Sequence, residues 1–215
     1  FMKILTAISA IFVMSISSDF LKSLNIYKIE YPILILCSIL GMMVMISSND
    51  LIVFYLGLEL QSLALYVLAS FNRDNILSTE SGLKYFVLSA LSSGLLLYGC
   101  SLIYGFTGST NFIDISNNTY EVPYALTFGI VFILVGLAFK ISAVPFHMWA
   151  PDVYQGSPTS VTMFFALIPK IAATCVFIRF LYVPFINMID QWQMIIIFIS
   201  IASMIFGAIA AIGQK

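Results

Sequence analysis

The chain has 215 residues, of which 61% are hydrophobic and 9% are charged, and its formal net charge is −1. Soluble domains carry about 25% charged residues, so this composition excludes a soluble globular domain and predicts a membrane protein. The slightly negative charge also excludes the basic surface of a nucleic-acid-binding protein.

Seven apolar runs approach the length of about 20 residues that an α-helix needs to cross a bilayer. Segments of about ten residues with alternating polarity, the mark of a membrane β-barrel, do not occur. The sequence therefore predicts an all-α polytopic membrane protein with about seven transmembrane helices. We expect these helices at residues 3–18, 31–47, 51–71, 79–106, from 123 into the segment 136–160, 158–183 and 189–212.

The linkers between these runs differ in composition. The longest, residues 107–121, is rich in Asn, Ser and Thr and is expected to form an exposed loop. Lys3 and Arg179 lie near helix ends on the side of the membrane opposite the cytoplasm or matrix, and Arg179 is expected to be an interfacial anchor. More basic residues follow the first, third and seventh runs, which places those ends on the cytoplasmic or matrix side by the positive-inside rule. These residues are Lys22, Lys28, Arg73 and Lys215.

Glu59 and Lys170 lie near the middle of their predicted helices. Glu59 is eight residues past Leu51 and Lys170 is twelve past Pro158, which at 1.5 Å per residue gives depths of about 12 and 18 Å. A charge at the bilayer centre costs about 2.5–3.5 kcal/mol even on a lenient insertion scale. Each side chain must therefore face protein or water and find a partner.

Lys140 precedes Pro145 in the unusual segment 136–160. Proline lacks the N–H that would bond the carbonyl four residues earlier, and in lipid that carbonyl needs another partner. We expect a broken helix that continues through residues 146–150, which would place Lys140 centrally. A helix that ended at the proline would leave Lys140 at the membrane edge. Pro169 repeats the arrangement beside a second lysine.

Glu59, Lys140 and Lys170 have both a structural and a chemical interpretation. A buried carboxylate–ammonium pair can hold helices together without conducting anything. A pair that opens and closes changes how tightly its members hold protons, because a nearby opposite charge favours the charged form of each group. Such a pair can act as a switch that moves protons along a chain of polar groups.

Three other polar residues have simpler interpretations beside the functional one. Lys84, near the start of the fourth run, either extends its amine to the interface or joins the intramembrane set. His147, near the helix break, is a capping or loop histidine or a proton carrier. Asp152 in "APDVYQGSP" is expected to be a turn or cap residue.

Residues that bind redox cofactors are scarce. Cys37, Cys100 and Cys175 stand alone in apolar runs and there is a single histidine, which argues against a disulfide framework, an iron–sulfur site or a bis-histidine haem. No glycine-rich phosphate loop follows a strand-like run. We therefore expect no cofactor or metal in this chain.

Three long motifs resemble a known family: "DLIVFYLGLELQSLALYVLASF", "SGLKYFVLSALSSGLLLYG" and "GLAFKISAVPFHMWAPDVYQGSPTSVTMFFALIPKIAA". They are similar to subunit 2 of respiratory NADH:ubiquinone oxidoreductase, complex I. That subunit belongs to the antiporter-like proton-translocating family, with subunits 4 and 5 and the Mrp cation/proton antiporters. The resemblance covers essentially the whole chain, and the block from Phe139 to Pro158 is highly specific to the family.

The resemblance implies a role for each matching residue. Glu59 matches the family's intramembrane glutamate, and Lys140 matches the lysine on a discontinuous helix that pairs with it. Lys84 matches a membrane lysine of the next helix, and Lys170 matches the central lysine that passes protons onward. His147 matches a histidine near the break. The implied function is a proton-translocating membrane-arm subunit of NADH:ubiquinone reductase, with NADH, FMN, Fe–S clusters and ubiquinone bound by other subunits.

Full-length family members have about fourteen helices in two inverted repeats, and this chain resembles roughly helices three to nine. It is expected to form a single antiporter-like domain, residues 1–215, without the first two helices and most of the second repeat. The sequence is then partial, or a separate chain carries the second repeat, or the subunit is truncated.

Two alternatives to a pump stay open: a non-pumping structural scaffold of the membrane arm, and a Mrp-type Na⁺/H⁺ antiporter subunit. The expected partners are other complex I membrane-arm subunits and the lipid bilayer. The many Phe, Ile and Tyr residues are typical of an AT-rich organelle genome. We therefore expect the mitochondrial inner membrane, with a chloroplast thylakoid or a bacterial plasma membrane as alternatives.

Overall fold

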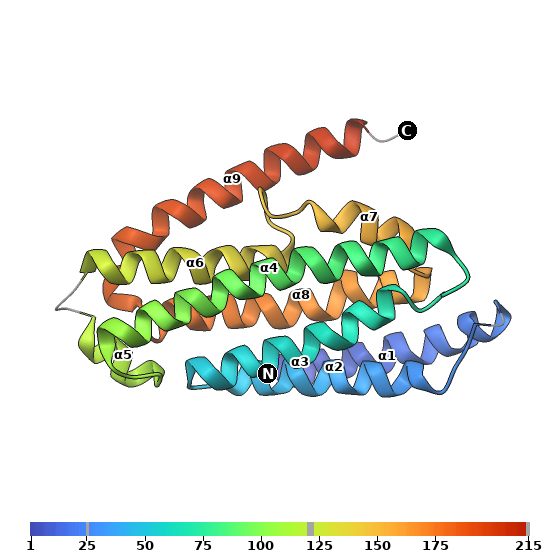
Figure 1. Ribbon diagram of the computed structural model, residues 1–215, viewed down its shortest axis with the longest axis horizontal. Helices are drawn as coiled ribbons and strands as arrows, with labels where there is room; N and C mark the ends of the chain where they lie inside the picture. Colours follow the sequence, from blue (N-terminus) through green and yellow to red (C-terminus); the bar gives the residue numbers. More distant parts are fainter. Residues whose placement is uncertain (25, 120–122, 214–215) are drawn as a thin grey trace.

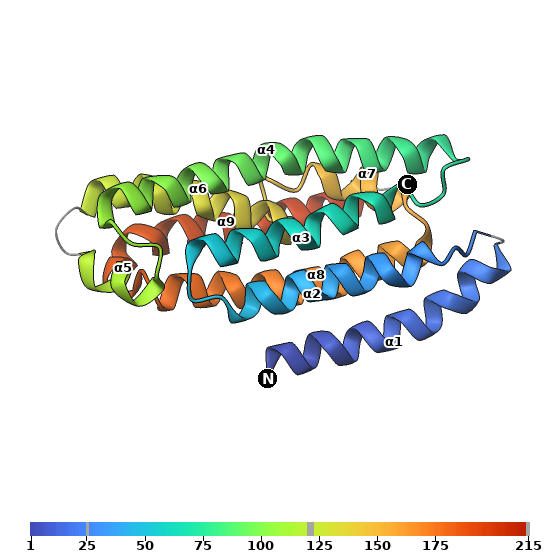
Figure 2. The ribbon, with the colours of Figure 1, turned by 60° about the horizontal axis from the view of Figure 1, so that its bottom comes forward.

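Helices that run back and forth along one long axis make up most of this computed structural model, which describes residues 1–24, 26–119 and 123–213 (Figures 1 and 2). The elements are α1 (Met2–Ser23), α2 (Glu30–Ser47), α3 (Leu51–Ala69), α4 (Ile76–Thr107), α5 (Phe112–Asn118), α6 (Pro123–Ile141), α7 (Trp149–Gly156), α8 (Thr159–Tyr182), the 3₁₀ turn η1 (Ile186–Met188) and α9 (Ile189–Gly213).

The predicted all-α membrane fold is confirmed. Among the described residues, six helices are long and apolar enough to cross a membrane, and α6 adds a shorter apolar helix, Leu126–Ile141. Together they correspond to the seven apolar runs of the sequence. The chain is therefore an integral, multi-pass membrane protein.

Polar caps set several helix ends. Asp50 Oδ1 accepts a hydrogen bond from the Ile52 N–H at 2.8 Å and starts α3, while Asn75 Oδ1 accepts from the Leu77 N–H at 2.9 Å and starts α4. α4 ends at Gly108, whose φ of +70° is a left-handed conformation that glycine adopts without a steric penalty. The cap at Asn75 starts α4 three residues earlier than the apolar run predicts.

Glycines let helix backbones come close together. A Cβ atom on Gly41 of α2 would lie 2.5 Å from the Gln61 nitrogen and 2.7 Å from the Gly57 oxygen of α3. A Cβ on Gly99 of α4 would lie 2.7 Å from the Gly129 oxygen of α6. Small residues at such crossings are the usual means of helix association in membranes. These contacts fix α3 and α4, which carry much of the candidate site.

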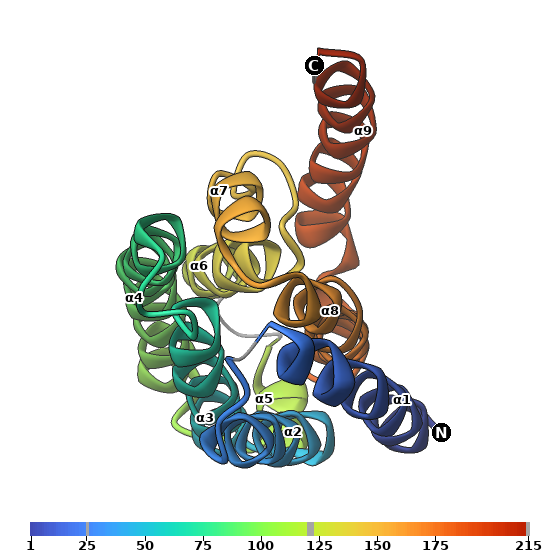
Figure 3. The ribbon, with the colours of Figure 1, turned by 90° about the vertical axis from the view of Figure 1, so that its right-hand side faces the viewer.

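α8 packs against α1, α2, α3 and α6 (Figure 3). α9 diverges from the other helices at its C-terminal end and exposes apolar side chains such as Phe198 and Ile209. α8 also continues as a helix through Pro169, so the second lysine–proline pair does not interrupt its helix.

The linker 107–121 differs from the predicted exposed loop. Its residues Phe112–Asn118 fold into α5, where Asn111 Oδ1 accepts a hydrogen bond from the Ile113 N–H at 2.9 Å. Phe112 and Ile115 are buried, and the Phe112 ring meets that of Phe180 on α8. The loop prediction was wrong because these apolar side chains, one turn apart, hold the segment on the bundle. The end of this linker, residues 120–121, and the orientation signal at residue 215 lie outside the described residues.

Candidate functional site

The predicted break in the fifth apolar run is confirmed. α6 ends at Ile141, the chain is non-helical through residues 142–148, and α7 begins at Trp149. α6 and α7 follow one another along the length of α4 (Figure 1). The helix therefore resumes in the same direction, as expected, but only at Trp149, so the prediction of helix at residues 146–148 was wrong. α6 already ends four residues before Pro145.

The end of α6 is stabilised by hydrogen bonds to its last carbonyls. The Ala143 N–H donates to the Ala138 oxygen at 2.9 Å and the Ser142 N–H donates to the Phe139 oxygen at 3.1 Å. Ser142 has a φ of 59°, which completes a Schellman-type cap without glycine. Trp149 Nε1 also donates to the Phe139 oxygen, at 2.9 Å. The start of α7 is thus bonded to the residue next to Lys140.

Lys140 lies one residue before the end of α6 and is 6% exposed. Its Nζ donates hydrogen bonds to Ser62 Oγ on α3 and to Ser89 Oγ on α4, both at 2.7 Å. Three helices therefore meet at one ammonium group. Two neutral hydroxyls replace part of the water shell that the charge loses on burial.

Tyr66 belongs to the same hydrogen-bonded group, which we call the Lys140 cluster and which consists of Lys140, Ser62, Ser89 and Tyr66. Its hydroxyl donates to Ser89 Oγ at 2.6 Å, so that oxygen accepts hydrogen bonds from both Tyr66 and Lys140. The Ser62 hydroxyl donates to the Leu58 carbonyl at 2.6 Å. Lys140 Nζ also lies 5.9 Å from the centroid of the Tyr66 ring, within cation–π range.

Glu59 lies one turn before Ser62 on α3, and its Oε1 is enclosed without a hydrogen-bond partner among the described residues. No ion pair joins Glu59 to Lys140 within those residues, so the expected closed pair is absent from this conformation. The reason is position, because Lys140 meets α3 at the level of Ser62.

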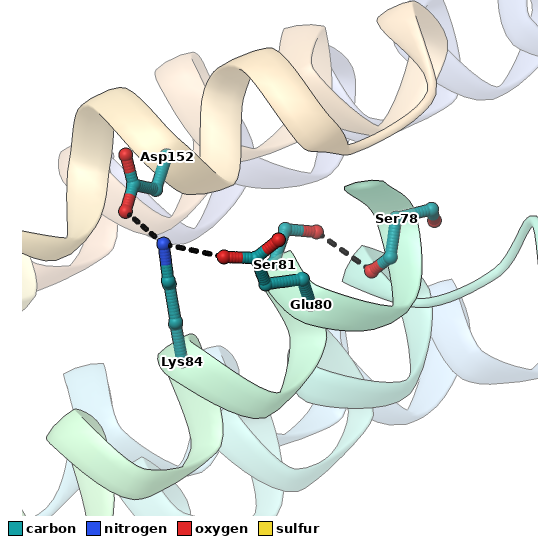
Figure 4. Close-up of polar contacts among 5 residues, drawn as sticks. All are labelled: Ser78, Glu80, Ser81, Lys84 and Asp152. Carbon is teal, nitrogen blue, oxygen red and sulfur yellow. Dashed lines mark hydrogen bonds and ion pairs between the residues drawn. The ribbon is translucent and has the colours of Figure 1, made fainter. Parts of the chain in front are cut away.

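Lys84 lies on the surface of α4 and is held by two carboxylates. Its Nζ is 2.8 Å from Glu80 Oε1 on the preceding turn and 2.7 Å from Asp152 Oδ2 on α7 (Figure 4). The Lys84 side chain is 42% exposed, which separates it from the buried Lys140 cluster. Asp152 does lie in the first turn of α7, but it bonds across to α4 instead of acting only as a local cap.

Lys170 is half-buried in the middle of α8, as its depth in the sequence predicts. Its Nζ lies 5.3 Å from the centroid of the Tyr154 ring on α7, a cation–π contact. No ion pair involves Lys170 among the described residues. An aromatic face therefore takes the place of the expected charged partner.

His147 lies within the break and faces α9. Its ring centroid is 5.6 Å from that of Phe206, and its Nδ1 is enclosed without a hydrogen-bond partner among the described residues. The nearby Val144 N–H donates to Ser203 Oγ of α9 at 3.0 Å. The structure thus places His147 on the α9 side of the break and gives it no hydrogen bond to Lys140 within the described chain.

α7 connects these separate lysines. Asp152 pairs with Lys84, the Tyr154 ring meets Lys170, and Trp149 bonds the backbone beside Lys140. Trp149 also stacks on Tyr85 of α4, with the ring centroids 4.5 Å apart. A shift of this short helix would change the surroundings of all three lysines.

Sequence reasoning missed the direct partners of Lys140. Ser62, Ser89 and Tyr66 all bond within its cluster. The available signal was spacing, because Glu59, Ser62 and Tyr66 recur at three and four residues along one face of α3. For Ser89 no signal distinguishes it from the neighbouring serines of α4.

Arg179, expected to be an interfacial anchor, bonds the C-terminal end of α2. Its guanidinium donates to the Ile46 carbonyl and to Asn49 Oδ1. This contact satisfies a helix-end carbonyl and places Arg179 in a structural position. Across the described residues, no group of three or more His, Cys, Asp or Glu side chains is arranged to hold a metal ion.

The model of the family "NADH:quinone oxidoreductase/Mrp antiporter, TM" matches residues 48–215. NADH-quinone oxidoreductase subunit N of Pelagibacter ubique is 78% identical over 215 residues, covering 100% of this chain and 46% of the relative. The chain thus spans about half the length of the curated relatives it matches.

Solved structures of complex I and of a Mrp complex contain chains that are similar to this one. Respiratory complex I from Thermus thermophilus contains a chain with 34% identity and a TM-score of 0.72, covering 83% of this chain and 38% of that one. The Mrp complex from Dietzia sp. contains one with 28% identity and a TM-score of 0.76, covering 86% and 35%.

Proposed function

This chain belongs to the NADH:quinone oxidoreductase/Mrp antiporter family of membrane subunits, and we propose that it carries protons within the membrane arm of a NADH-quinone oxidoreductase. Relatives that are 78% and 56% identical are both named subunit N of that enzyme, which supports the finer assignment to this subunit. Both relatives are bacterial, so they favour the plasma membrane of a bacterium over the mitochondrial inner membrane.

The observation that carries this proposal is the position of Lys140. It is a buried ammonium at the end of a broken helix, held by hydroxyls from two continuous helices. A buried lysine that only holds helices together is usually paired with a carboxylate, which offsets the free-energy cost of taking its charge out of water. Lys140 instead has neutral acceptors, while the Glu59 carboxylate lies one turn from Ser62.

We infer that Lys140 alternates between these two environments. Beside Glu59 the ammonium is stabilised by an opposite charge and holds its proton tightly. Between Ser62 and Ser89 it has only dipoles as partners and gives up the proton more readily. The conformation described here corresponds to the second state. A small displacement of the end of α6 toward Glu59 would give the first.

The remaining site residues act around this switch. Lys170 receives protons along the bundle interior, beside Tyr154. Lys84 acts from the α4–α7 surface through Asp152, and His147 acts on the α9 side of the break. The support for these roles is that α7 and the break contact all three positions. NADH, FMN, Fe–S clusters and ubiquinone are assigned to partner subunits of the complex.

Na⁺/H⁺ antiport is the second candidate, favoured by the TM-score of 0.76 with a chain of the Mrp complex. The two functions differ in what drives them. The full-length protein in its assembled complex, reconstituted into vesicles, should acidify one side when NADH is oxidised, with or without Na⁺. Proton movement that required a Na⁺ gradient and ignored NADH would support the antiporter instead, and an absence of proton movement in an assembled complex would support the scaffold.

A further inference from the structure

A hollow of about 480 Å³ lies where the start of α2, the end of α3 and the start of α4 meet. It is separate from the Lys140 cluster and lies on the side that the positive-inside rule assigns to the cytoplasm. Its volume is within the range of about 300–1,000 Å³ that is usual for ligand pockets.

One part of the hollow is charged. Lys28 and Arg73 line it together with a single carboxylate, Glu30, so two positive charges and one negative charge leave a net charge of +1. Lys28 and Arg73 are exposed, and neither has an ion-pair partner among the described residues. Two exposed cations with only one carboxylate beside them at a membrane surface favour an anionic ligand.

The other part of the hollow is apolar. Leu34 of α2 and Val67 of α3 contribute to its wall, together with Phe71 just after α3. Val67 is 48% exposed, so this wall opens toward the lipid-facing side of the bundle. A ligand that fills both parts must have an anionic head and an apolar tail.

We propose that this hollow binds an anionic phospholipid of the cytoplasmic leaflet. The phosphate would lie between Arg73 and Lys28, and an acyl chain would run along Val67 and Leu34. The planar guanidinium of Arg73 can donate two parallel hydrogen bonds to a phosphate. Basic pockets between transmembrane helices on the cytoplasmic side recognise lipid headgroups in this way. The inference is independent of the proposed proton transfer.

The test uses the full-length protein in its purified complex, with bound lipid quantified by native mass spectrometry. Phosphatidylglycerol and phosphatidylcholine serve as anionic and zwitterionic probes. We expect preferential binding of phosphatidylglycerol, and roughly a fivefold loss of affinity in Arg73→Ala, because each surface cation contributes about one kilocalorie per mole. Arg73→Lys should lose less, since the charge is kept.

Two further variants separate specific binding from general damage. Lys22→Ala removes an exposed lysine at the end of α1 that lies outside the hollow, over the Tyr27 ring, and should leave phosphatidylglycerol binding unchanged. Glu30→Gln removes the opposing carboxylate and should strengthen binding, a gain that misfolding cannot imitate. Equal binding of both lipids, equal losses in Arg73→Ala and Lys22→Ala, or a complex in which a protein subunit fills the hollow would overturn the proposal.

Discussion

Lys140 Nζ lies 2.7 Å from Ser89 Oγ, and this hydrogen bond joins the last turn of the broken helix α6 to the middle of the continuous helix α4. Ser89 Oγ also accepts a hydrogen bond from the Tyr66 hydroxyl, so one serine oxygen joins three helices. The position of the ammonium therefore depends on hydroxyl groups, which the proposed switch would exchange for the Glu59 carboxylate.

Replacing Ser89 should destabilise this arrangement. Ser89→Ala removes an acceptor from a buried charge and from Tyr66, and we expect a loss of about 1.5 kcal/mol. This value is at the low end of the range for a hydrogen bond to a charged group. We choose the low end because hydrogen bonds inside bilayers average nearer to about 0.6 kcal/mol. Thermal unfolding of the purified complex measures the change.

Ser93→Ala is the matched control for Ser89→Ala. Ser93 is also buried on α4, but its hydroxyl has no hydrogen-bond partner among the described residues. Its loss should leave the unfolding temperature unchanged or raise it slightly. An equal destabilisation in both variants would show that the Lys140–Ser89 bond contributes nothing specific.

Two tryptophans that each donate a hydrogen bond to a backbone carbonyl, Trp149 and Trp192, allow a second comparison. Trp149→Phe should keep the stacking on Tyr85 and lose the indole bond to the Phe139 carbonyl, next to Lys140. Trp192→Phe loses an equivalent bond to the Phe185 carbonyl, also at 2.9 Å, away from the lysines. Each should cost about 1 kcal/mol of stability. Only Trp149→Phe should reduce proton translocation per electron, and an equal reduction in both would refute the link between α7 and Lys140.

The close contact between α2 and α3 predicts a steric effect. The added methyl in Gly41→Ala would meet the Gln61 backbone at 2.5 Å, so the helices must separate at a cost of about 1–3 kcal/mol. A methyl at Gly94 would meet no atom within 4 Å, and Gly94→Ala should stabilise α4 by up to about 1 kcal/mol. A higher unfolding temperature for Gly41→Ala than for Gly94→Ala would rule out the close approach of Gly41 to α3.

Asp152 and Lys84 should act as a unit. Their side chains are 52% and 42% exposed, so solvent screening should keep the effect of Asp152→Asn on stability small. Proton translocation should fall, because α7 loses its charged contact with α4. Combining Asp152→Asn with Lys84→Met should lower proton translocation no further than either substitution alone. Fully additive losses would show that Lys84 does not act through Asp152.

The sequence was most informative where local chemistry decides the structure. The lack of an N–H at Pro145 predicted a break near Lys140, and the depth of Glu59 and Lys170 placed both inside the bundle. The same local reasoning failed for Asp152, which resembles a turn residue but bonds a lysine 68 positions away. Such a partner depends on how α7 packs on α4, which no local pattern reveals.

The hydrogen-bond partners of Lys140 also depend on how the helices pack, which local sequence patterns do not reveal. The family resemblance implied a pair between Lys140 and Glu59. The register of α6 against α3 instead places the ammonium opposite Ser62, one turn further along. The position of α6 depends on its close glycine contact with α4, between Gly99 and Gly129, and its end depends on the cap at Ser142, which form only in the folded bundle.

The most direct measurement is the number of protons translocated per electron by the full-length Lys140→Ala protein in its assembled, reconstituted complex. Lys3→Ala, which changes an exposed lysine near a helix end, is the matched control. We expect Lys140→Ala to lower the proton-to-electron ratio while NADH oxidation and assembly persist, and Lys3→Ala to leave it unchanged. An unchanged ratio in an intact Lys140→Ala complex would contradict the assignment of Lys140 as the proton switch.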